Sequence, residues 1–507
     1  MYASSQADRR GVAWSVVGAA IPFLLLAGLY WEFVVDDAYI TFRYAIHFAN
    51  GVGLVYNPTT IVDGYTSFLW TVLLGCAVCA FAEANIVLIT KILATALSVL
   101  ALSYVCFLAR SAPLHQPLWI AAVLTAASPA FVISAADGLE TPLYIAVQMV
   151  FVARWLRDLQ DSLLSTPLGM WAALLALIRP DGLLLVVLSV LLFLWLSSRE
   201  SKSLARLLPF AVAFSVIYLP YFAWHWLYYG YPFPNTFYAK MGGQWDLFVQ
   251  GVDRLLKWQQ EMGSIVSLLF VLFALFKLRL PYTYILAAVV LARALLVLWS
   301  GGEVMGHHRF MAPAVPAYWL LFQAGLWGWL GRVSSSHRLT RCAKLVIPLI
   351  LLCASGAITV SHLPKYQQYA EGLSQAHIRL GRWIHQNTSP ETRIAVGDAG
   401  AIPYYARRHT IDIMGLNDPH IAHLPGRLGR RIDTDYILSQ KPDLIILLSE
   451  VAPPADFKGL TPIDQALYEA VIRRQEYILH SVYQFNERYY LWVMAHQWGR
   501  WMQRPCD

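Results

Sequence analysis

Charged residues are scarce in this chain. Asp, Glu, Lys and Arg make up 14% of its 507 residues, hydrophobic residues make up 58%, and the mean hydropathy is +0.50. A water-soluble protein of this length needs more charge than this to cover its surface. The composition therefore excludes a soluble globular protein and predicts an α-helical polytopic membrane protein.

Cysteine is scarce as well, and its spacing fits neither a metal site nor a disulfide framework. Cys76 and Cys79 are three residues apart in an apolar run, where small side chains ordinarily pack. A Gly-rich nucleotide-binding loop is also missing from the sequence. These absences argue against a structural zinc protein, a disulfide scaffold and a nucleotide-dependent enzyme.

Basic residues outnumber acidic ones, giving a formal net charge of +7 and a pI of about 9.0. The bases lie between apolar stretches and do not form a stripe, so they are a topology signal and predict no nucleic-acid partner.

Long hydrophobic stretches are abundant, and they predict about 11 transmembrane helices. The first, residues 12–33, is about as long as a bilayer and is interpreted as an uncleaved anchor. The stretch 66–82 is short and polar at both ends, and we expect it to lie on the outer surface. Several bases then face the cytoplasm, as the positive-inside rule requires: Arg110, Arg154, Arg157, Lys277, Arg279 and Arg332.

This topology predicts a transmembrane domain over residues 1–362 with a first periplasmic loop at 34–85. Residues 363–507 are predicted to form a small periplasmic, extracytoplasmic α/β domain. Short apolar runs indicate its strands, near 391–400, 408–414 and 442–448, with a closing hairpin at 477–494.

The pair Asp36-Asp37 directly follows the first hydrophobic stretch. Two adjacent carboxylates at a membrane surface are costly unless they bind or react with something. One of them could accept a proton from an attacking hydroxyl, or both could hold a divalent cation (Mg, Mn or Ca) against a phosphate. A solvated helix cap is the alternative that involves no chemistry.

Other polar motifs are predicted on the same face of the membrane as this pair. Glu140 follows Asp137-Gly138, and Arg179 opens Arg-Pro-Asp-Gly on the side where the positive-inside rule does not favour a base. An anionic partner, a phosphate or a carboxylate, is therefore expected for Arg179.

Two further loops combine glycine, aromatic and charged residues. Residues 228–240 are rich in Tyr, Phe and Pro and end in Asn235, Tyr238 and Lys240, which suits a sugar or a lipid phosphate as well as an ordinary interfacial aromatic belt. Residues 301–310 place glycines beside charged side chains, and this favours a phosphate group over a zinc ion. Those side chains are Glu303, His307, His308 and Arg309.

These segments resemble a branch of the GT-C glycosyltransferases, that of the mycobacterial terminal arabinofuranosyltransferase AftB and the related pilin arabinosyltransferases. The resemblance rests on Asp-Asp-Ala-Tyr-Ile-Thr-Phe-Arg-Tyr from Asp36, Asp-Gly-Tyr-Thr-Ser-Phe-Leu-Trp from Asp63 and Arg-Pro-Asp-Gly from Arg179. It continues with Tyr-Gly-Tyr-Pro-Phe-Pro-Asn-Thr-Phe-Tyr-Ala-Lys from Tyr229 and Gly-Asp-Ala-Gly from Gly397. The chain departs from the family at residue 303, where Glu replaces the expected Asp.

The resemblance implies a membrane enzyme that transfers a sugar, arabinofuranose, from a polyprenyl-phosphate donor to a glycan or glycoprotein acceptor of the cell envelope. Asp36 and Asp37 would be the essential acidic pair and the candidate metal ligands. The resemblance also implies that the protein lies in the inner membrane of a bacterial cell. The donor phosphate is assigned by charge and location to Arg179, Lys240, His308 and Arg309. Glu140 would orient the sugar or the acceptor, and Asp398, Asn417 and Asp418 would cover the acceptor. The remaining expected substrate contacts are Arg43, Tyr65, Asn235, Tyr238, Glu303 and His307.

Two alternatives stay open at this stage. The same fold could use a polyprenyl-phosphate hexose, mannose or glucose. A lipid-linked glycan transporter is less favoured, because its ionisable groups would be expected nearer the membrane midplane and within an internal repeat.

Overall fold

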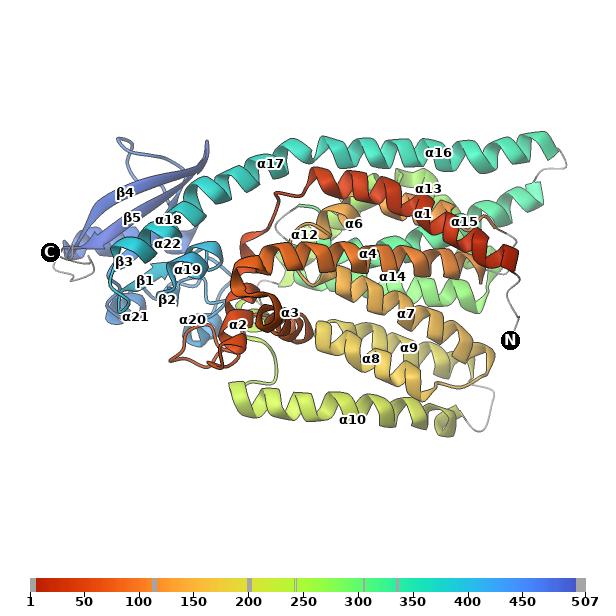
Figure 1. Ribbon diagram of the computed structural model, residues 1–507, viewed down its shortest axis with the longest axis horizontal. Coiled ribbons are helices and arrows are strands. Elements are labelled where there is room, and N and C mark those ends of the chain that lie inside the picture. Colours follow the sequence, from red (N-terminus) through yellow and green to blue (C-terminus); the bar gives the residue numbers. More distant parts are fainter. Residues whose placement is uncertain are drawn as a thin grey trace. The chain divides into compact units, whose positions relative to one another are not determined.

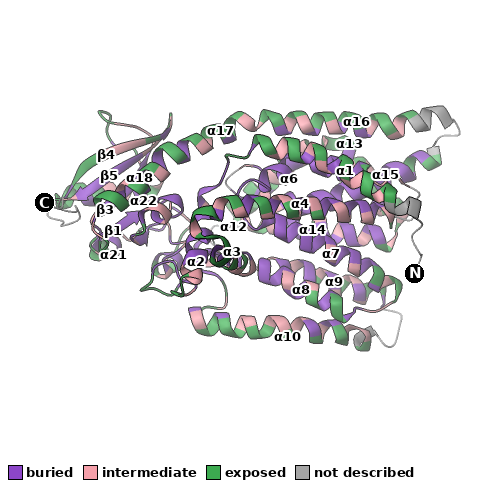
Figure 2. Ribbon diagram, in the orientation of Figure 1, coloured by how far each residue is buried: buried purple, intermediate pink, exposed green. Residues whose placement is uncertain are grey.

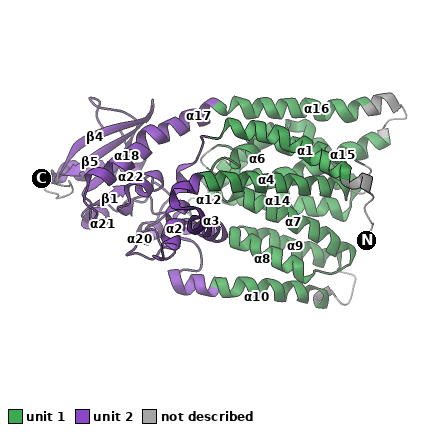
Figure 3. Ribbon diagram, viewed as in Figure 1, with its two compact units in different colours: residues 1–31, 88–222, 244–363 green, residues 32–87, 223–243, 364–507 purple. Residues whose placement is uncertain are grey.

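The computed structural model describes residues 6–111, 116–197, 203–240, 242, 244–303, 306–333 and 337–497. The chain forms two compact units, each assembled from separate stretches of sequence (Figure 3). Unit 1 comprises residues 1–31, 88–222 and 244–363, and unit 2 comprises residues 32–87, 223–243 and 364–507.

Unit 1 is a bundle of helices (Figure 1). Its elements are α1 (Gln6–Leu29), α4 (Ile86–Arg110), α5 (Ile120–Ala127), α6 (Pro129–Ser134), α7 (Thr141–Gln160), α8 (Thr166–Ile178), α9 (Gly182–Leu196), most of α10 (Ser203–Tyr229), α12 (Gln244–Glu261), α13 (Ser264–Phe273), η2 (Ala274–Leu278), α14 (Pro281–Ser300), η3 (Arg309–Ala314), α15 (Val315–Val333) and α16 (His337–Ser361). Prolines punctuate it: α6 begins at Pro129 and α14 at Pro281, where the missing N–H costs no hydrogen bond.

Five helices of the described chain are long and apolar enough to cross a membrane, and a sixth is reached if α12 and α13, which meet at a bend of 93°, count as one span. Apolar side chains such as Val212, Val216 and Leu219 are exposed along α10 (Figure 2), as a lipid-facing helix requires. The prediction of a multi-pass, mostly helical membrane protein is confirmed. The count of about 11 transmembrane helices remains a prediction.

Several elements of unit 1 end close together. The hydroxyl of Tyr30, just after α1, donates to the carbonyl of Thr359 near the end of α16. The ammonium of Lys91 donates to the carbonyls of Trp31 and, at 3.4 Å, of Ala136. The chain therefore leaves α1 and α16 at the same end of unit 1, and the turn before Glu140 lies there too.

Unit 2 carries the sheet and shorter helices around it (Figure 1). Its helices are α2 (Asp36–Ala49), α3 (Phe68–Phe81), η1 (Glu83–Asn85), α11 (Asn235–Lys240), α17 (Leu363–Gly372), η4 (Leu373–Ile378), α18 (Arg379–Asn387), α19 (Ala401–Ala406), α20 (Pro419–His423), α21 (Thr434–Ser439) and α22 (Pro462–Arg474). Its strands are β1 (Arg393–Val396), β2 (His409–Asp412), β3 (Leu444–Ser449), β4 (Tyr477–Asn486) and β5 (Tyr489–His496).

The five strands form one sheet in the order β2-β1-β3-β5-β4. Strand β1 is parallel to β2 and β3, while the hairpin β4–β5 adds antiparallel to β3. All six residues of β3 are buried, as expected for a central strand covered on both faces. The predicted small C-terminal sheet is confirmed, and the predicted domain bounds of 363–507 remain a prediction.

The loop that follows α2 belongs to unit 2 because it extends the edge of this sheet. The side-chain amide of Asn57 donates to the carbonyl of Thr410 in β2 at 2.9 Å and accepts from the N–H of Thr410 at 3.0 Å. An amide that pairs in this way stands in for a neighbouring strand and satisfies an edge that would otherwise be open.

Candidate functional site

The acidic pair opens α2, where the helix dipole favours negative charge. The Asp36 side chain is buried, and its two oxygens accept the N–H groups of Gly400 at 3.0 Å and Ala401 at 2.7 Å. Its backbone N–H donates to the Tyr369 hydroxyl at 3.1 Å. Asp36 therefore joins α2 to the turn before α19 and to α17, all within unit 2.

Burial raises the pKa of Asp36 to about 7, and the charges of Asp398 and Asp37 act in the same direction. His377 and the N–H of Ala401 oppose this shift. The His377 ring lies beside Asp398, with Nε2 and Oδ2 2.7 Å apart. Burial alone would lower the pKa of His377, but the hydrogen bond to Asp398 and the charges of Asp398 and Asp36 raise it.

Asp37 has different surroundings from its neighbour. It is half-buried, and among the described residues its carboxylate makes no hydrogen bond or ion pair. Its two oxygens therefore keep their full capacity to accept protons or hydrogen bonds from a substrate.

Arg43 and Tyr65, both predicted substrate contacts, lie in the interior of unit 2. The Arg43 guanidinium donates to the carbonyls of Tyr56, Pro403 and Arg408 at 2.7–2.8 Å and to the Asn57 side chain at 3.2 Å. These bonds occupy most of its donors and tie α2 to the region around α19 and β2. The buried Tyr65 hydroxyl accepts from a second tyrosine hydroxyl at 3.2 Å.

The aromatic segment at residues 228–240 contributes side chains that hold unit 2 together and others that are exposed. The Asn235 amide donates to the carbonyls of Gly415 and Leu416 at 2.8 and 3.0 Å, while its own oxygen is buried with no hydrogen-bond partner among the described residues. The Tyr238 ring packs against His423 at 4.5 Å. Lys240 is exposed at the end of α11.

Asn417 and Asp418 organise the turn before α20. Asn417 donates its backbone and side-chain N–H groups to one oxygen of Asp412, at 2.8 and 3.0 Å. Asp418 caps α20 by accepting the N–H of Ile421 at 3.1 Å and also accepts the Tyr436 hydroxyl at 3.0 Å. Asp412 was not predicted as a site residue, although its position at the end of the apolar strand β2 was a usable signal.

In unit 1, Arg179 has the anionic partners that the sequence led us to expect, but both belong to the protein. Its guanidinium pairs with Glu140 and, at 2.7 Å, with Asp181, and Asp181 also pairs with Arg293. Arg293 is 2% exposed, and the sequence analysis missed it. The available signal was an arginine in the middle of an apolar stretch, where a charge needs a partner.

The 301–310 loop of unit 1 is held by its own carboxylate. Glu303 accepts the N–H groups of Gly306 and His307, both at 3.1 Å, and His307 Nε2 lies 3.3 Å from Asp137. Arg309 lies with its guanidinium 5.3 Å from the centre of the Phe310 ring, and its Nε is buried with no hydrogen-bond partner among the described residues.

The predicted residues thus form two groups, one in each unit. Unit 2 holds Asp36, Asp37, Arg43, Tyr65, Asn235, Tyr238, Lys240, Asp398, Asn417 and Asp418, and unit 1 holds Glu140, Arg179, Glu303, His307, His308 and Arg309. Within the part of the chain that the structure describes, no set of three or more His, Cys, Asp or Glu side chains is arranged to hold a metal ion. The divalent cation remains a prediction, and the open oxygens of Asp37 are the ones available to it.

Comparison with known proteins gives the following relatives. A family model described as a domain of unknown function, DUF8728, matches residues 364–500, and no curated protein matches the chain. The crystal structure of ArnT from Cupriavidus metallidurans bound to undecaprenyl phosphate is similar at a TM-score of 0.59 and 13% identity, over 95% of this chain and 97% of that one.

Two further solved structures are also similar. The archaeal oligosaccharyltransferase AglB from Archaeoglobus fulgidus, in complex with an inhibitory peptide and a dolichol-phosphate, has a TM-score of 0.59 and 12% identity, over 87% of this chain and 70% of that one. The arabinosyltransferase EmbB from Mycobacterium smegmatis matches at a TM-score of 0.44 and 13% identity, over 74% and 42% of the two chains, a likeness too weak to support an argument. At these identities the first two similarities establish the fold, and this multi-pass membrane protein has the GT-C fold.

Proposed function

We propose that this protein is a glycosyltransferase that takes a sugar from a polyprenyl-phosphate donor and transfers it to a glycan or glycoprotein of the cell envelope, on the periplasmic face. The fold supports the donor class, because the similar structures hold undecaprenyl phosphate in one case and dolichol-phosphate in the other. The observation that carries the proposal is the acidic pair of unit 2, in which one carboxylate is engaged and the other is open.

The reaction would proceed as follows. The oxygen of an acceptor hydroxyl forms a bond to the anomeric carbon of the sugar, and the bond from that carbon to the phosphate oxygen breaks. Polyprenyl phosphate leaves with the electron pair, and the hydroxyl proton passes to a carboxylate acting as general base. The sugar arrives already activated, so no nucleotide is required.

Asp37 is the proposed base because its oxygens are open to a substrate, whereas both oxygens of Asp36 accept backbone N–H groups. A divalent cation, if held by the pair, would supply charge neutralisation at the phosphate.

The transferred sugar is proposed to be arabinofuranose on the strength of the family resemblance in the sequence. Mannose or glucose on the same lipid carrier is the second candidate. The identity of the sugar changes the donor but not the proposed role of the acidic pair in the transfer.

The test is a transfer assay on the protein in lipid nanodiscs, with labelled polyprenyl-phosphoryl-arabinofuranose and an arabinan acceptor. We expect Asp37→Asn to lower turnover by roughly 10²–10⁴-fold without changing thermal unfolding. Asp36→Asn should lower both turnover and the unfolding temperature, because an amide NH₂ cannot accept the N–H of Gly400. The exposed Asp456→Asn serves as a matched control and should behave as wild type.

The outcomes separate the alternatives. Full turnover in Asp37→Asn would contradict its role as base, and loss confined to a stably folded Asp36→Asn would assign the base to Asp36. Movement of the lipid-linked sugar across the bilayer without bond cleavage would contradict the enzyme and support a transporter.

A further inference from the structure

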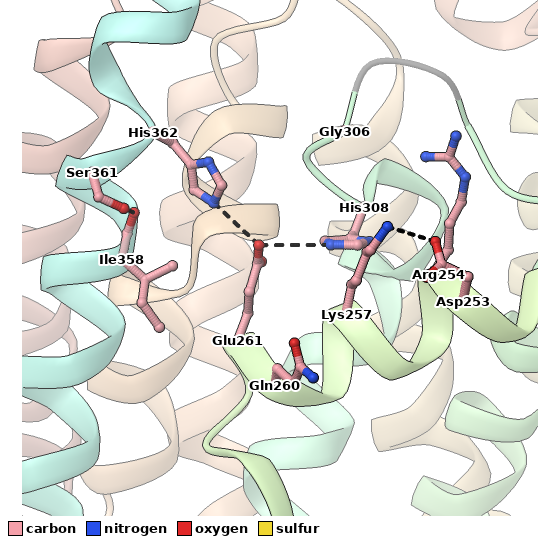
Figure 4. A pocket seen from close by; sticks show the side chains of 10 residues that line it. All are labelled: Asp253, Arg254, Lys257, Gln260, Glu261, Gly306, His308, Ile358, Ser361 and His362. Atoms are coloured by element: carbon pink, nitrogen blue, oxygen red, sulfur yellow. Dashed lines mark hydrogen bonds and ion pairs between the residues drawn. The ribbon is translucent and has the colours of Figure 1, made fainter.

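Unit 1 contains a polar cavity of about 510 Å³ in which His308 is the one residue predicted from the sequence to contact the donor (Figure 4). It lies between α12, the turn at residues 306–308 and the end of α16. Its lining side chains are Asp253, Arg254, Lys257, Gln260, Glu261, His308, Ser361 and His362, with Gly306 and Ile358.

The charged side chains that line this cavity are unevenly paired. Glu261 Oε1 lies 3.1 Å from His362 Nε2 and 3.6 Å from His308 Nε2, so the two imidazoles surround the one carboxylate. Lys257 is paired with Asp253 at 2.6 Å. The Arg254 guanidinium makes no hydrogen bond or ion pair with any described residue. The two acidic side chains therefore have close partners, and Arg254 is the charged group of the lining that is left for a ligand. A bound monoanion would give the Arg254 guanidinium the partner charge that it lacks among the described residues.

The helix that carries these residues is amphipathic. Five large apolar side chains of α12 are exposed on a stripe with helical spacing, at Trp245, Phe248, Val249, Val252 and Leu256. The polar residues that line the cavity are on a different face of the same helix. A helix with one apolar stripe and one polar face lies in the membrane interface, with its stripe among the acyl chains. The sharp bend between Glu261 and Ser264 then turns the chain towards the apolar α13.

The opposite wall of the cavity also lies at the boundary between an apolar and a polar part of the chain. Ile358, Ser361 and His362 stand where the apolar run of α16 gives way to the polar α17. A cavity bounded by an interfacial helix and by the end of an apolar helix lies at the level of the lipid head groups. Arginine is well suited to this depth, because its fork of donors matches the oxygens of a phosphate.

We propose that this cavity binds the head group of an anionic phospholipid of the surrounding bilayer. The phosphodiester oxygens accept hydrogen bonds from Arg254 and Lys257, and Gln260 and Ser361 contact the polar remainder of the head group. The acyl chains continue along the apolar stripe of α12. This role is independent of sugar transfer, so it stands or falls separately from the proposed function.

The test is native mass spectrometry of the full chain, released from detergent, with phosphatidylglycerol as the probe and phosphatidylcholine as the uncharged comparison. We expect phosphatidylglycerol to bind more tightly than phosphatidylcholine, and Arg254→Gln to weaken that binding by about tenfold. Arg254→Lys should retain part of it. Lys277→Gln removes an exposed base of unit 1 outside the cavity and should bind as wild type.

Thermal unfolding in the absence of added lipid should be the same for Arg254→Gln and wild type, because Arg254 has no hydrogen bond or ion pair with the described residues to lose. Equal binding of phosphatidylglycerol by both proteins would overturn the proposal. Displacement of the phospholipid by inorganic phosphate at similar concentration would also overturn it, in favour of a free-anion site. Stoichiometric displacement by polyprenyl phosphate would reassign the cavity to the lipid substrate.

Discussion

At the scale of single residues, Asp36 and Asp37 follow one another in the chain but have different partners. Asp36 bonds to backbone groups that lie 364 and 365 positions away in the sequence, and Asp37 keeps its oxygens open. The position of the pair after an apolar stretch identifies it in the sequence. The division between an engaged and an open carboxylate cannot be read there, because it depends on a contact between residues far apart in the chain.

The buried Asp36 should make the stability of unit 2 depend on pH. Its pKa is about 7 in the folded protein and about 4 in an unfolded chain, so between these values the folded state holds a proton that the unfolded state has lost. Stability is therefore expected to fall as the pH rises through this window. His377 acts in the same direction, because its raised pKa gives stability that is lost as the pH rises through the folded value.

The unfolding temperature of the protein is measured at about pH 5 and about pH 8. Hydrogen exchange of residues 393–401 at the same two pH values reports on unit 2 in particular. The lower pH should give the higher unfolding temperature, and Asp36→Asn should reduce the difference. A higher unfolding temperature at the higher pH would contradict the assignment of a raised pKa to Asp36.

The contact between Asp36 and the turn before α19 also requires a glycine. A Cβ at Gly400 would come within 2.0 Å of the Asp36 carbonyl oxygen and 2.5 Å of its carboxylate. Gly400→Ala should therefore destabilise unit 2 by about 2–4 kcal/mol, the cost of steric overlap together with the loss of buried hydrogen bonds. Gly397→Ala is the matched control in the same turn, since its Cβ would approach nothing closer than the flexible Met414 side chain at 3.2 Å. Equal unfolding temperatures for the two variants would contradict this account.

At the scale of secondary-structure elements, apolar runs in the sequence predicted the strands of the C-terminal sheet and many of the helices. The strands β1 and β2 lie within the predicted segments 391–400 and 408–414, and β3 overlaps the segment 442–448 and ends one residue beyond it. Strands of a covered sheet read as continuous apolar runs, which is why these segments were recognised. Helix α12 was not predicted, because its polar face lowers its average hydropathy below that of a span. Its apolar residues recur at helical spacing. This periodicity would have indicated the helix, whereas the mean hydropathy of the segment does not.

Close helix contacts in unit 1 depend on particular glycines. A Cβ at Gly325 of α15 would lie 1.8 Å from the carbonyl oxygen of Phe270 in α13, whereas Gly331 in the same helix faces open space. We expect Gly325→Ala to separate the two helices and lower the unfolding temperature of unit 1. Gly331→Ala should leave it unchanged or slightly higher, because alanine favours the helix. Indistinguishable unfolding of the two variants would show that these helices tolerate a wider separation.

At the scale of the whole molecule, the sequence supports a helical membrane protein with a C-terminal sheet. It does not reveal that residues 32–87 and 223–243 fold with that sheet in unit 2, since this follows from contacts such as Asn57 with Thr410. In unit 1, the turn before Glu140 lies close to the ends of α1 and α16. The predicted membrane topology requires this, because it places these segments on the same face of the membrane.

The predicted orientation places residues 363–507 outside the cytoplasm. Fusion of alkaline phosphatase after residue 497 should give an active reporter, because that enzyme matures only where disulfides form. A fusion after Asp161, between α7 and α8, should be inactive and serves as the cytoplasmic control. Activity in the reverse pattern would contradict the orientation and, with it, a periplasmic site.

The central claim is glycosyl transfer from a polyprenyl-phosphate donor. It is tested most directly by incubating wild-type protein in nanodiscs with polyprenyl-phosphoryl-arabinofuranose, -mannose or -glucose and an acceptor glycan, and by quantifying free polyprenyl phosphate and glycosylated acceptor together. The account predicts that one of these donors, expected to be the arabinofuranose, yields one polyprenyl phosphate for each sugar added. Donors that all remain intact in the presence of acceptor would contradict it.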